Sequence, residues 1–462
     1  MSHPLSGPTP QAFAADRKPG PIDVIEIIDT PRIGAFRTVV IAMCFLVAMM
    51  DGFDTLAIAL AAPSISGEWQ IAPERFGPLL AIGLFGSVIG AAIAGLFGDR
   101  IGRKQTTLAS VAVFGVLTFA CGLTHSYGQL FLLRLLAGIG LGGALPNFLA
   151  LTSEYAAASW RTTATTIVAW GFPLGAIFGG LFVPQLIHAH GWQMIFFVGG
   201  AVPIILLPAL FIGLPESIRF LILRGKEKAA IISILRRIAP GLAITPDPIF
   251  ILPKATSKLG VGAVLSGPYL LGTMLLSASQ FFYQLIYYLL ANWIPLLLHM
   301  AGLPVGQAVL GTVAMNAGGV VGSFVLSRLM DHTKRPLLII GGGYLVSVPC
   351  IVGVASAGHS FVALAIALFV TGFCLTGAGL SMTGFIPAFY PTPIRSTGVG
   401  VSQALARTGS LIGPLAGSLF LAIGLTPRQL FIASTAFPIL SVICLLTLAW
   451  RSKTRIRAEA EA

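Results

Sequence analysis

The stretch MMDGFDTLAIALAAPSI, residues 49–65, places two aspartates three residues apart inside a run that is otherwise apolar. A helix needs roughly 20 apolar residues to cross a hydrocarbon core about 30 Å thick. The run over residues 37–63 has that length, so Asp51 and Asp54 would lie at membrane depth. An ionised carboxylate there costs roughly 3 kcal/mol even on lenient insertion scales. We therefore expect both side chains to face a functional cavity and not the lipid.

The composition of the whole chain supports a membrane-spanning fold. Of the 462 residues, 56% are hydrophobic and 10% are charged, whereas about 25% of residues are charged in soluble domains. The sequence therefore predicts an all-α membrane protein with twelve transmembrane helices. The predicted spans cover residues 37–63, 76–98, 106–124, 128–152, 162–187, 192–213, 268–298, 306–330, 336–357, 360–389, 395–424 and 428–450.

The spans form two groups of six, separated by a long polar connection. We expect an N-terminal bundle over 37–213, a central connection over 214–267 and a C-terminal bundle over 268–450, with tails at 1–36 and 451–462. Lysine and arginine gather in both tails and in the even-numbered connections, which by the positive-inside rule face the cytoplasm. The net charge of +12 is therefore an orientation signal and not evidence for nucleic-acid binding.

The two halves of the chain repeat one another. The stretch EYAAASWRTTATTIVAWGFPLGAIFGG (154–180) matches FYPTPIRSTGVGVSQALARTGSLIGP (389–414). The matched positions are Arg161 with Arg395, Gly175 with Gly409 and Gly179 with Gly413 at an offset of 234, and Asp99 with Asp331 at an offset of 232. Duplicated six-helix halves are typical of a secondary transporter whose substrate site lies between the bundles near the bilayer midplane.

Several motifs resemble those of a known family. The stretch GLFGDRIGRKQ (95–105) resembles the loop signature of the major facilitator superfamily, and RLLAGIGLGG (134–143) resembles its fourth-helix motif. The stretches DGFDTLAIALAAPSI (51–65), LGGALPNFLALTSEY (141–155) and YPTPIRSTGVGVSQALARTGSLIGP (390–414) are similar to the bacterial aromatic acid:proton symporter family. The resemblance implies the two-bundle fold of that superfamily. It also implies import of an aromatic carboxylate, of the benzoate or hydroxybenzoate class, together with a proton across the inner membrane.

Three buried charges are our candidates for proton coupling. With a rise of about 1.5 Å per residue, Asp51 and Arg134 both lie about 9 Å from the outer face of the hydrocarbon core, so we expect that they can pair. Asp54 shares a helix face with Asp51. Burial disfavours a charged carboxylate and a nearby guanidinium favours it, a competition that suits proton exchange. We expect Asp51 and Asp54 to carry or gate the proton while Arg134 switches between them; the alternative is a fixed Asp–Arg bridge that only holds the first and fourth spans together.

The candidates for substrate binding lie in the C-terminal bundle. Arg407 lies about 18 Å along its span from Arg395, near the midplane, and arginine matches a planar carboxylate with two parallel hydrogen bonds. Arg407 is therefore our first choice for the acid group, unless it pairs with one of the aspartates or with helix-end carbonyls. A polar stripe with aromatic neighbours suits a hydroxylated ring, unless its amides only join helices. The stripe consists of Gln280, Gln284, Tyr288 and Asn292.

The loop signature and its surroundings are interpreted as a cytoplasmic gate, as the resemblance implies; a cluster that only sets orientation is the alternative. The second copy, SRLMDHTKRP (327–336), lacks the glycine, so the gate is expected to be asymmetric. The residues assigned to the gate are Gly95, Asp99, Arg100, Gly102, Arg103, Lys104, Glu154, Arg161, Asp331 and Arg395.

Other functional classes find no support in the motifs. The chain has no nucleophile elbow, phosphate loop or metal-spaced histidine or cysteine set, so we expect no enzyme, no metal site and no cofactor other than the coupling proton. The expected partners are a small aromatic acid, a proton and membrane lipid, with no nucleic acid, and we expect a monomer in the bacterial inner membrane with both termini in the cytoplasm. A proton-driven exporter of small apolar or drug-like compounds is the alternative, because it shares the loop signature.

Overall fold

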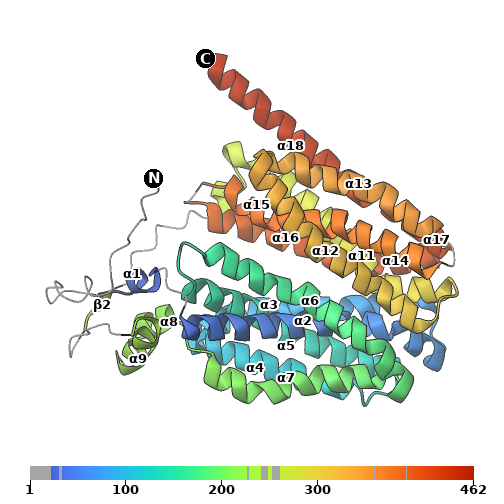
Figure 1. The fold of residues 1–462 in the computed structure, drawn as a ribbon, viewed down its shortest axis with the longest axis horizontal. Coiled ribbons are helices and arrows are strands. Elements are labelled where there is room, and N and C mark those ends of the chain that lie inside the picture. Colours follow the sequence, from blue (N-terminus) through green and yellow to red (C-terminus); the bar gives the residue numbers. More distant parts are fainter. Residues whose placement is uncertain are drawn as a thin grey trace, which may run out of the picture.

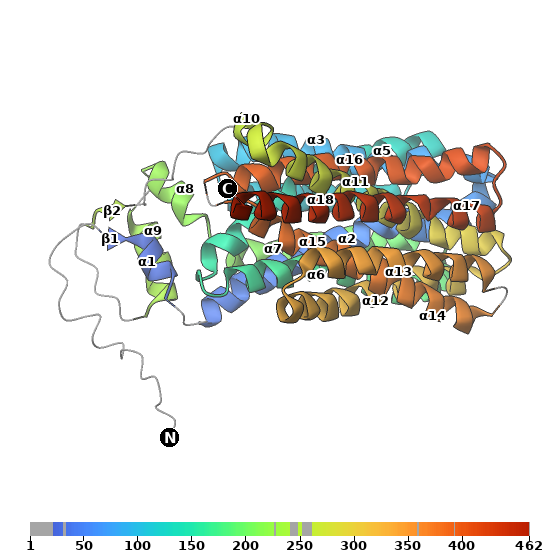
Figure 2. The same ribbon diagram turned by 90° about the horizontal axis from the view of Figure 1, so that it is seen from above.

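A computed structural model describes residues 22–30, 34–225, 228–240, 248–251, 261–357, 360–391 and 393–461. Over this part of the chain it has twelve helices long and apolar enough to cross a membrane, which confirms the predicted number. Figures 1 and 2 show them as two bundles of roughly parallel and antiparallel helices lying side by side. Only helices satisfy every backbone hydrogen bond within one segment, so long apolar runs in lipid adopt this form.

The helices of each bundle follow the chain order. Those of the N-terminal bundle are α2 (Ala35–Trp69), α3 (Phe76–Ile101), α4 (Arg103–Cys121), α5 (Tyr127–Tyr155), α6 (Arg161–His190) and α7 (Gln193–Gly213). Those of the C-terminal bundle are α11 (Leu270–Met300), α12 (Val305–Thr333), α13 (Pro336–Ser356), α14 (Phe361–Thr371) with α15 (Gly377–Phe389), α16 (Arg395–Ala422), and α17 (Pro427–Ser434) with α18 (Ala436–Glu461). A π-helical turn, Gly372–Thr376 (η4), joins α14 to α15, and a 3₁₀ turn, Pro73–Arg75 (η2), precedes α3.

Short elements cover one end of the N-terminal bundle, which we call the tail end; the opposite end is the far end. The tail-end elements are β1 (Ile22–Asp23), α1 (Val24–Ile28), α8 (Ile218–Leu223), α9 (Lys228–Ile238) and β2 (Phe250–Ile251). Strands β1 and β2 pair in parallel and join the N-terminal segment to the central connection. α10 (Val261–Val264) and the 3₁₀ turn Gly267–Tyr269 (η3) lead into α11. The predicted tails and connection lie partly outside the described residues.

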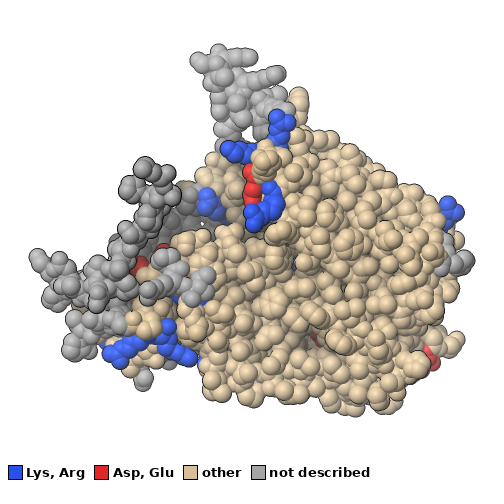
Figure 3. All heavy atoms as spheres, in the orientation of Figure 1, with Lys and Arg blue, Asp and Glu red and all other residues tan. Residues whose placement is uncertain are grey.

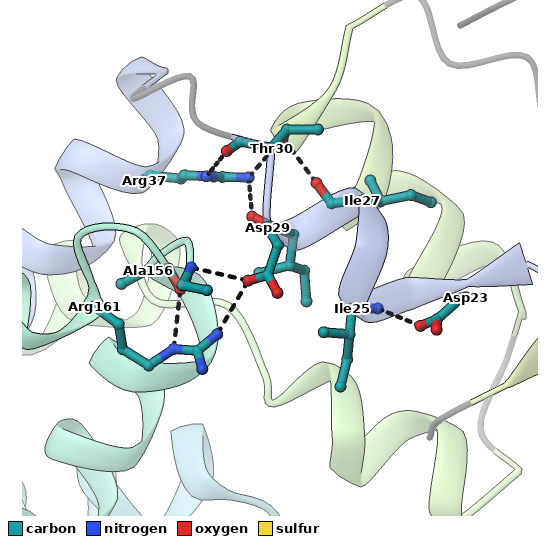
Figure 4. A network of polar contacts seen from close by, with 10 residues as sticks. Asp23, Ile25, Ile27, Asp29, Thr30, Arg37, Ala156 and Arg161 are labelled. Atoms are coloured by element: carbon teal, nitrogen blue, oxygen red, sulfur yellow. Dashed lines mark hydrogen bonds and ion pairs between the residues drawn. The ribbon is translucent and has the colours of Figure 1, made fainter. Parts of the chain in front are cut away.

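Polar contacts hold the N-terminal segment against this end of the bundle (Figure 4). Asp29 points toward Arg161, whose Nη2 lies 3.2 Å from Asp29 Oδ1. Arg37 is 1% exposed and donates to the carbonyls of Thr30 at 2.9 Å and of Ile28 at 2.7 Å. These contacts place α1 over the start of α2 and of α6.

The internal repeat is visible in the contacts of the structure. Arg161 Nε donates to the Ala156 carbonyl at 3.3 Å, and Arg395 Nε donates to the Tyr390 carbonyl at the same distance. Gly175 brings α6 directly onto the backbone of α2, where a Cβ would meet the carbonyl of Met49. Gly409 and Gly413 bring α16 onto the backbone of α11 in the same way. The matched glycines therefore lie at equivalent helix pairs, α6 against α2 in the N-terminal bundle and α16 against α11 in the C-terminal bundle.

Two separate hydrophobic cores show where the bundles join. One core includes the far half of α2 and residues of α11 such as Leu290 and Trp293, so it belongs to both bundles. The other contains only the tail half of the N-terminal bundle together with α1, α8 and α9. Contacts between the bundles, such as Gly77 against Ser418 and Gly306 against Pro184, lie at the far end. The tail halves of the two bundles do not share a core.

The outer surface suits contact with lipid. Large apolar side chains are exposed along the outside of the helices, for example Ile205 at 73%, Ile212 at 78% and Ile423 at 66%. Figure 3 shows a face whose broad middle carries almost no charged side chain, with lysine and arginine gathered toward the tail end. The chain is therefore a multi-pass membrane protein, since an apolar surface of this extent is not found on soluble monomers.

Candidate functional site

A buried ion pair joins α2 to α5 within the N-terminal bundle. Arg134 Nη1 donates to Asp54 Oδ1 at 3.1 Å and to Oδ2 at 3.2 Å, and its Nη2 donates to the Asp54 carbonyl at 2.9 Å. Thr118 of α4 donates to Asp54 Oδ1 at 2.5 Å. Asp54 is 0% and Arg134 2% exposed. The carboxylate thus has two partners, Arg134 and Thr118, on two other helices.

The partner of Arg134 differs from the one that the depth count favoured. Equal depth pointed to Asp51, but the structure pairs Arg134 with Asp54, one turn closer to the far end. Side chains on a helix lean toward its N-terminus, and α5 begins at the far end. The long side chain of Arg134 therefore extends from its backbone toward the far end, where it reaches the level of Asp54.

Asp51 faces the boundary between the bundles. It accepts a hydrogen bond from Thr55 at 3.4 Å and is 6% exposed. Its electrostatic partners include Arg407 of α16 as well as the nearby Asp54. Tyr288 of α11 lies within electrostatic range of both Asp51 and Arg407. One residue of the N-terminal bundle thus lies within electrostatic range of two residues of the C-terminal bundle.

Arg407 keeps its guanidinium half-buried and outside hydrogen-bonding contact with Asp51. Among the residues that the structure describes, it forms no ion pair, although Asp51 acts on it electrostatically. A guanidinium in this situation offers its planar fork of donors to a carboxylate. The arrangement allows the predicted role of Arg407 in binding the acid group, and Asp51 is the aspartate that interacts with Arg407 electrostatically.

The predicted polar stripe of α11 divides into two pairs. Gln284 and Tyr288 are half-buried, whereas Gln280 and Asn292 are each 1% exposed. Asn292 Nδ2 donates to the Tyr288 carbonyl at 2.8 Å, and its Oδ1 has no partner among the described residues. Gln280 Oε1 likewise has no partner there. The stripe therefore presents both accessible and deeply buried groups.

Sequence reasoning missed two polar side chains close to the site. Tyr287 Oη donates to Asn316 Oδ1 at 3.0 Å, and Asn316 Nδ2 donates to the Thr312 carbonyl at 3.0 Å. Asn316 is 0% exposed on α12. Thr118, the second partner of the Asp54 carboxylate, was also missed. The signal for Asn316 was available, because it is an isolated amide inside an apolar span, and such residues often join helices or bind ligands.

The loop signature forms a compact contact network at the tail end. Arg103 Nη1 lies 2.6 Å from Glu154 Oε1. The Lys104 amide donates to Glu216 Oε1 at 3.1 Å. Gly102 has a φ of +106°, and a Cβ on it would collide with the Glu216 carboxylate. Glu216, an isolated acid in a basic connection, was missed by the sequence reasoning and ties α4 to the start of α8.

The structure shows fewer contacts for four other residues assigned to the gate. Gly95 has open space around it. Arg100 borders a hollow of about 820 Å³ together with Lys104 and Glu216. Asp331 is exposed, and Asp99 lies in α3 with its side chain outside what the structure describes. The function of these residues as a gate stays a prediction.

The described residues hold no group of three histidine, cysteine, aspartate or glutamate side chains that could bind a metal ion. The charged groups near the middle of the spans are two carboxylates and two guanidiniums. They are Asp51, Asp54, Arg134 and Arg407. This set can exchange a proton and bind an anion.

Comparisons with known proteins agree with this arrangement. The family model "Major Facilitator Superfamily" matches residues 44–357. The gallate transporter of Pseudomonas putida is 35% identical over 89% of this chain and 91% of its own. The 3-(3-hydroxy-phenyl)propionate transporter of Escherichia coli (strain K12) is 34% identical over 94% of this chain and 99% of its own. The 4-hydroxybenzoate transporter PcaK of P. putida is 34% identical over 89% and 92%.

A solved structure shows the same fold. A bacterial homologue of the human lysosomal transporter Spinster, in an inward-facing and occupied conformation, superposes with a TM-score of 0.69 at 18% identity, covering 90% of this chain and 97% of that one. The fold and the site define a membrane transporter built from two six-helix bundles. The chain belongs to the major facilitator superfamily and groups there with bacterial aromatic acid transporters. It is not an enzyme.

Proposed function

We propose that this protein imports an aromatic carboxylate together with a proton across the bacterial inner membrane, with both termini in the cytoplasm. The relatives named above carry gallate, 4-hydroxybenzoate or a hydroxyphenylpropionate, which supports an aromatic acid as substrate. The concentration of basic residues at the tail end supports a cytoplasmic position for that end. The proposed cycle is alternating access of one central site.

The placement of Asp51 opposite Arg407 carries the proposal. When Asp51 is ionised, its charge competes with the substrate carboxylate for the Arg407 guanidinium. Protonation of Asp51 removes that competitor, so a bound proton strengthens substrate binding. By linkage, a bound substrate then strengthens proton binding to the same extent. Two ligands that favour each other at one site are transported together, which is symport.

The charge balance of the site supports a stoichiometry of one proton for each substrate carboxylate. Asp51 and Asp54 balance Arg134 and Arg407 when no substrate is bound. An arriving carboxylate alone leaves a net negative charge in a region of low dielectric, which is costly. A carboxylate that arrives with one proton leaves the site neutral. Neutrality in both loaded and empty states lets either form change conformation.

The contacts between the bundles support alternating access. The N-terminal bundle contributes only its far half to the hydrophobic core that it shares with the C-terminal bundle, and its tail half has a core of its own. The proposed motion separates the bundles at the tail end, where their tail halves share no core, and so opens the central site to the cytoplasm. The glycine-mediated contacts inside each bundle keep each bundle rigid during such a motion.

The test is uptake of radiolabelled 4-hydroxybenzoate into proteoliposomes, with and without an inward proton gradient. We expect accumulation only with the gradient, and suppression of it by unlabelled aromatic acids. If no labelled aromatic acid is taken up in either condition, the proposal is wrong. If a neutral or cationic drug moves instead, in exchange for protons, the exporter alternative replaces it.

A further inference from the structure

Unpartnered polar atoms gather in the core of the C-terminal bundle. Buried polar groups normally have a hydrogen-bond partner, so each exception requires an explanation such as a water molecule or a ligand. At membrane depth the need is greater, because lipid supplies no partners. Among the described residues, the unpartnered atoms of this bundle are Ser279 Oγ, Gln280 Oε1, Asn292 Oδ1, Thr312 Oγ1, Tyr344 Oη, Thr371 Oγ1 and Thr376 Oγ1.

Several of these atoms belong to one region between α11, α12 and the π-helical turn. Thr312 lies one helical turn from Asn316, which accepts the Tyr287 hydroxyl hydrogen at 3.0 Å. Thr376 lies in the π-helical turn and packs against Gly319 of α12. Gln280 lies on the same face of α11 as Tyr287, two turns or about 10 Å nearer the tail end, and the Tyr287 side chain leans toward that end because α11 begins there. π-Helical turns inside helices occur frequently at functional sites.

The hydrogen-bond directions show what kind of group fits here. Because Tyr287 donates its hydrogen to Asn316, its oxygen is left as an acceptor. Gln280 Oε1 is also an acceptor, and the free hydroxyl of Thr376 can donate or accept. A carboxylate only accepts hydrogen bonds, so this region does not suit it. A phenolic hydroxyl donates one hydrogen and accepts others, which matches the groups present.

We propose that Tyr287, Asn316, Gln280 and Thr376 form a subsite that binds a ring hydroxyl of the substrate, while Arg407 binds its carboxylate. This inference rests on the proposed function and narrows it to hydroxylated aromatic acids. Tyr288 connects the two ends of the site: its ring contacts that of Tyr287 edge to face at 5.1 Å, and it lies within electrostatic range of Arg407. One aromatic ring of substrate bridges these two ends.

Further tyrosine rings back this subsite. The Tyr283 and Tyr287 rings lie 6.1 Å apart, and Tyr283 stacks on Tyr344 of α13 at 6.0 Å with an interplanar angle of 25°. Rings in this arrangement offer flat apolar surfaces beside the polar atoms, as small-ligand sites require. A site built to bind a hydroxyl discriminates against a substrate that lacks it, because its buried polar groups then stay unpaired.

The test compares benzoate with 4-hydroxybenzoate by counterflow in proteoliposomes, which needs no proton gradient. The informative variant is Tyr287→Phe, because it removes one oxygen atom and keeps the ring. We expect the wild type to bind 4-hydroxybenzoate at least about tenfold more tightly than benzoate, and the variant to lose about tenfold of that preference while benzoate exchange stays within about twofold. Gln280→Met, which removes the unpartnered acceptor at similar volume, is expected to reduce the preference in the same direction.

Tyr390→Phe is the matched control. Tyr390 is also buried in the C-terminal bundle, and its hydroxyl donates to Thr273 at 3.0 Å, but it lies at the tail end. This control should leave the preference unchanged. The subsite is ruled out if Tyr287→Phe keeps the wild-type preference, if it weakens both acids equally, or if the wild type prefers benzoate. If the wild type exchanges neither acid, the comparison is repeated with labelled gallate. If no labelled aromatic acid is exchanged, the proposed function itself is wrong, and the subsite is overturned with it.

Discussion

In the N-terminal bundle the buried charges of Asp54 and Arg134 neutralise each other, whereas in the C-terminal bundle several buried polar atoms have no hydrogen-bond partner among the described residues. Asp54 is enclosed by Arg134, Thr118 and its own helix. Arg407 has no ion pair among the described residues, and unpartnered hydroxyl and amide oxygens lie on the helices around it. Because both bundles derive from one repeat, we propose that this difference reflects a division of roles, with proton coupling in the first bundle and substrate recognition in the second.

Asp51 is where the two roles meet. It belongs to the N-terminal bundle, yet the cation that acts on it most strongly is Arg407 of the C-terminal bundle. Asp54, three residues away, has its charge neutralised inside its own bundle. Two aspartates on one helix therefore have different expected functions, and substitutions can separate them.

The largest expected effect is that of Asp51→Asn. The neutral amide resembles the protonated carboxyl group and no longer competes for Arg407, so substrate binding becomes independent of the proton. We expect gradient-driven accumulation to be lost completely while counterflow continues, both measured in the same proteoliposomes. Glu74→Gln, at an exposed position outside the site and the gate, should behave as wild type. Gradient-driven accumulation by Asp51→Asn would contradict the assignment.

Asp54→Asn is expected to act on stability first. It leaves the Arg134 guanidinium buried without its counter-charge, which typically costs roughly 3–5 kcal/mol of unfolding free energy. Thermal unfolding in detergent should show a large fall in Tm for Asp54→Asn. Thr118→Val removes one hydrogen bond, so it should lower the unfolding free energy by only about 1 kcal/mol and give a smaller fall in Tm. The double variant Asp54→Asn with Arg134→Met should recover part of the loss. A small effect of Asp54→Asn would show that the pair is not structural.

Substitution of Arg407 tests the C-terminal side of the comparison. Arg407→Ala removes the charge and both donors, and we expect the half-saturating substrate concentration in counterflow to rise about a hundredfold, or about 2.7 kcal/mol. Arg407→Lys keeps the charge but loses the planar fork, so a rise of about tenfold is expected. Retained affinity in Arg407→Ala would exclude this residue from substrate binding.

The smallest expected effect concerns the loop signature. Gly102 has φ +106° and ψ 154°, a backbone conformation that is essentially restricted to glycine, so Gly102→Ala should destabilise the protein by about 1–3 kcal/mol. Gly95→Ala, in open space within α3, should be neutral or stabilising by about 0.5–1 kcal/mol. Thermal unfolding of the two variants side by side makes the comparison. Equal Tm values would remove the argument for a constrained turn at Gly102.

Much of the fold could be predicted from the sequence because a bilayer allows few solutions. Long apolar runs must be helices, and the repeat around Arg161 and Arg395 divides them into two bundles. The elements α8 and α9 could not be predicted in the same way, because they are short and lie in a connection without membrane-length hydrophobicity. Their apolar side chains, such as Ile231 and Leu235, are buried only through contacts with the bundle.

The candidate site could be predicted only in part. Charged residues such as Asp51 and Arg407 are conspicuous in an apolar span because of their cost there. Neutral polar residues such as Asn316 and Thr118 cost less, so hydropathy does not distinguish them from packing residues. The partner of Arg134 depends on the lean of one long side chain, which helical rise alone does not describe.

The two hydrophobic cores have a consequence for how the molecule unfolds. A part of a protein with a core of its own can open as one cooperative unit while the rest stays folded. The tail half of the N-terminal bundle, with α1, α8 and α9, is such a unit. Its backbone amides should exchange their hydrogens for deuterium together, and those around Leu290 and Trp293 in the shared core should exchange only on global unfolding.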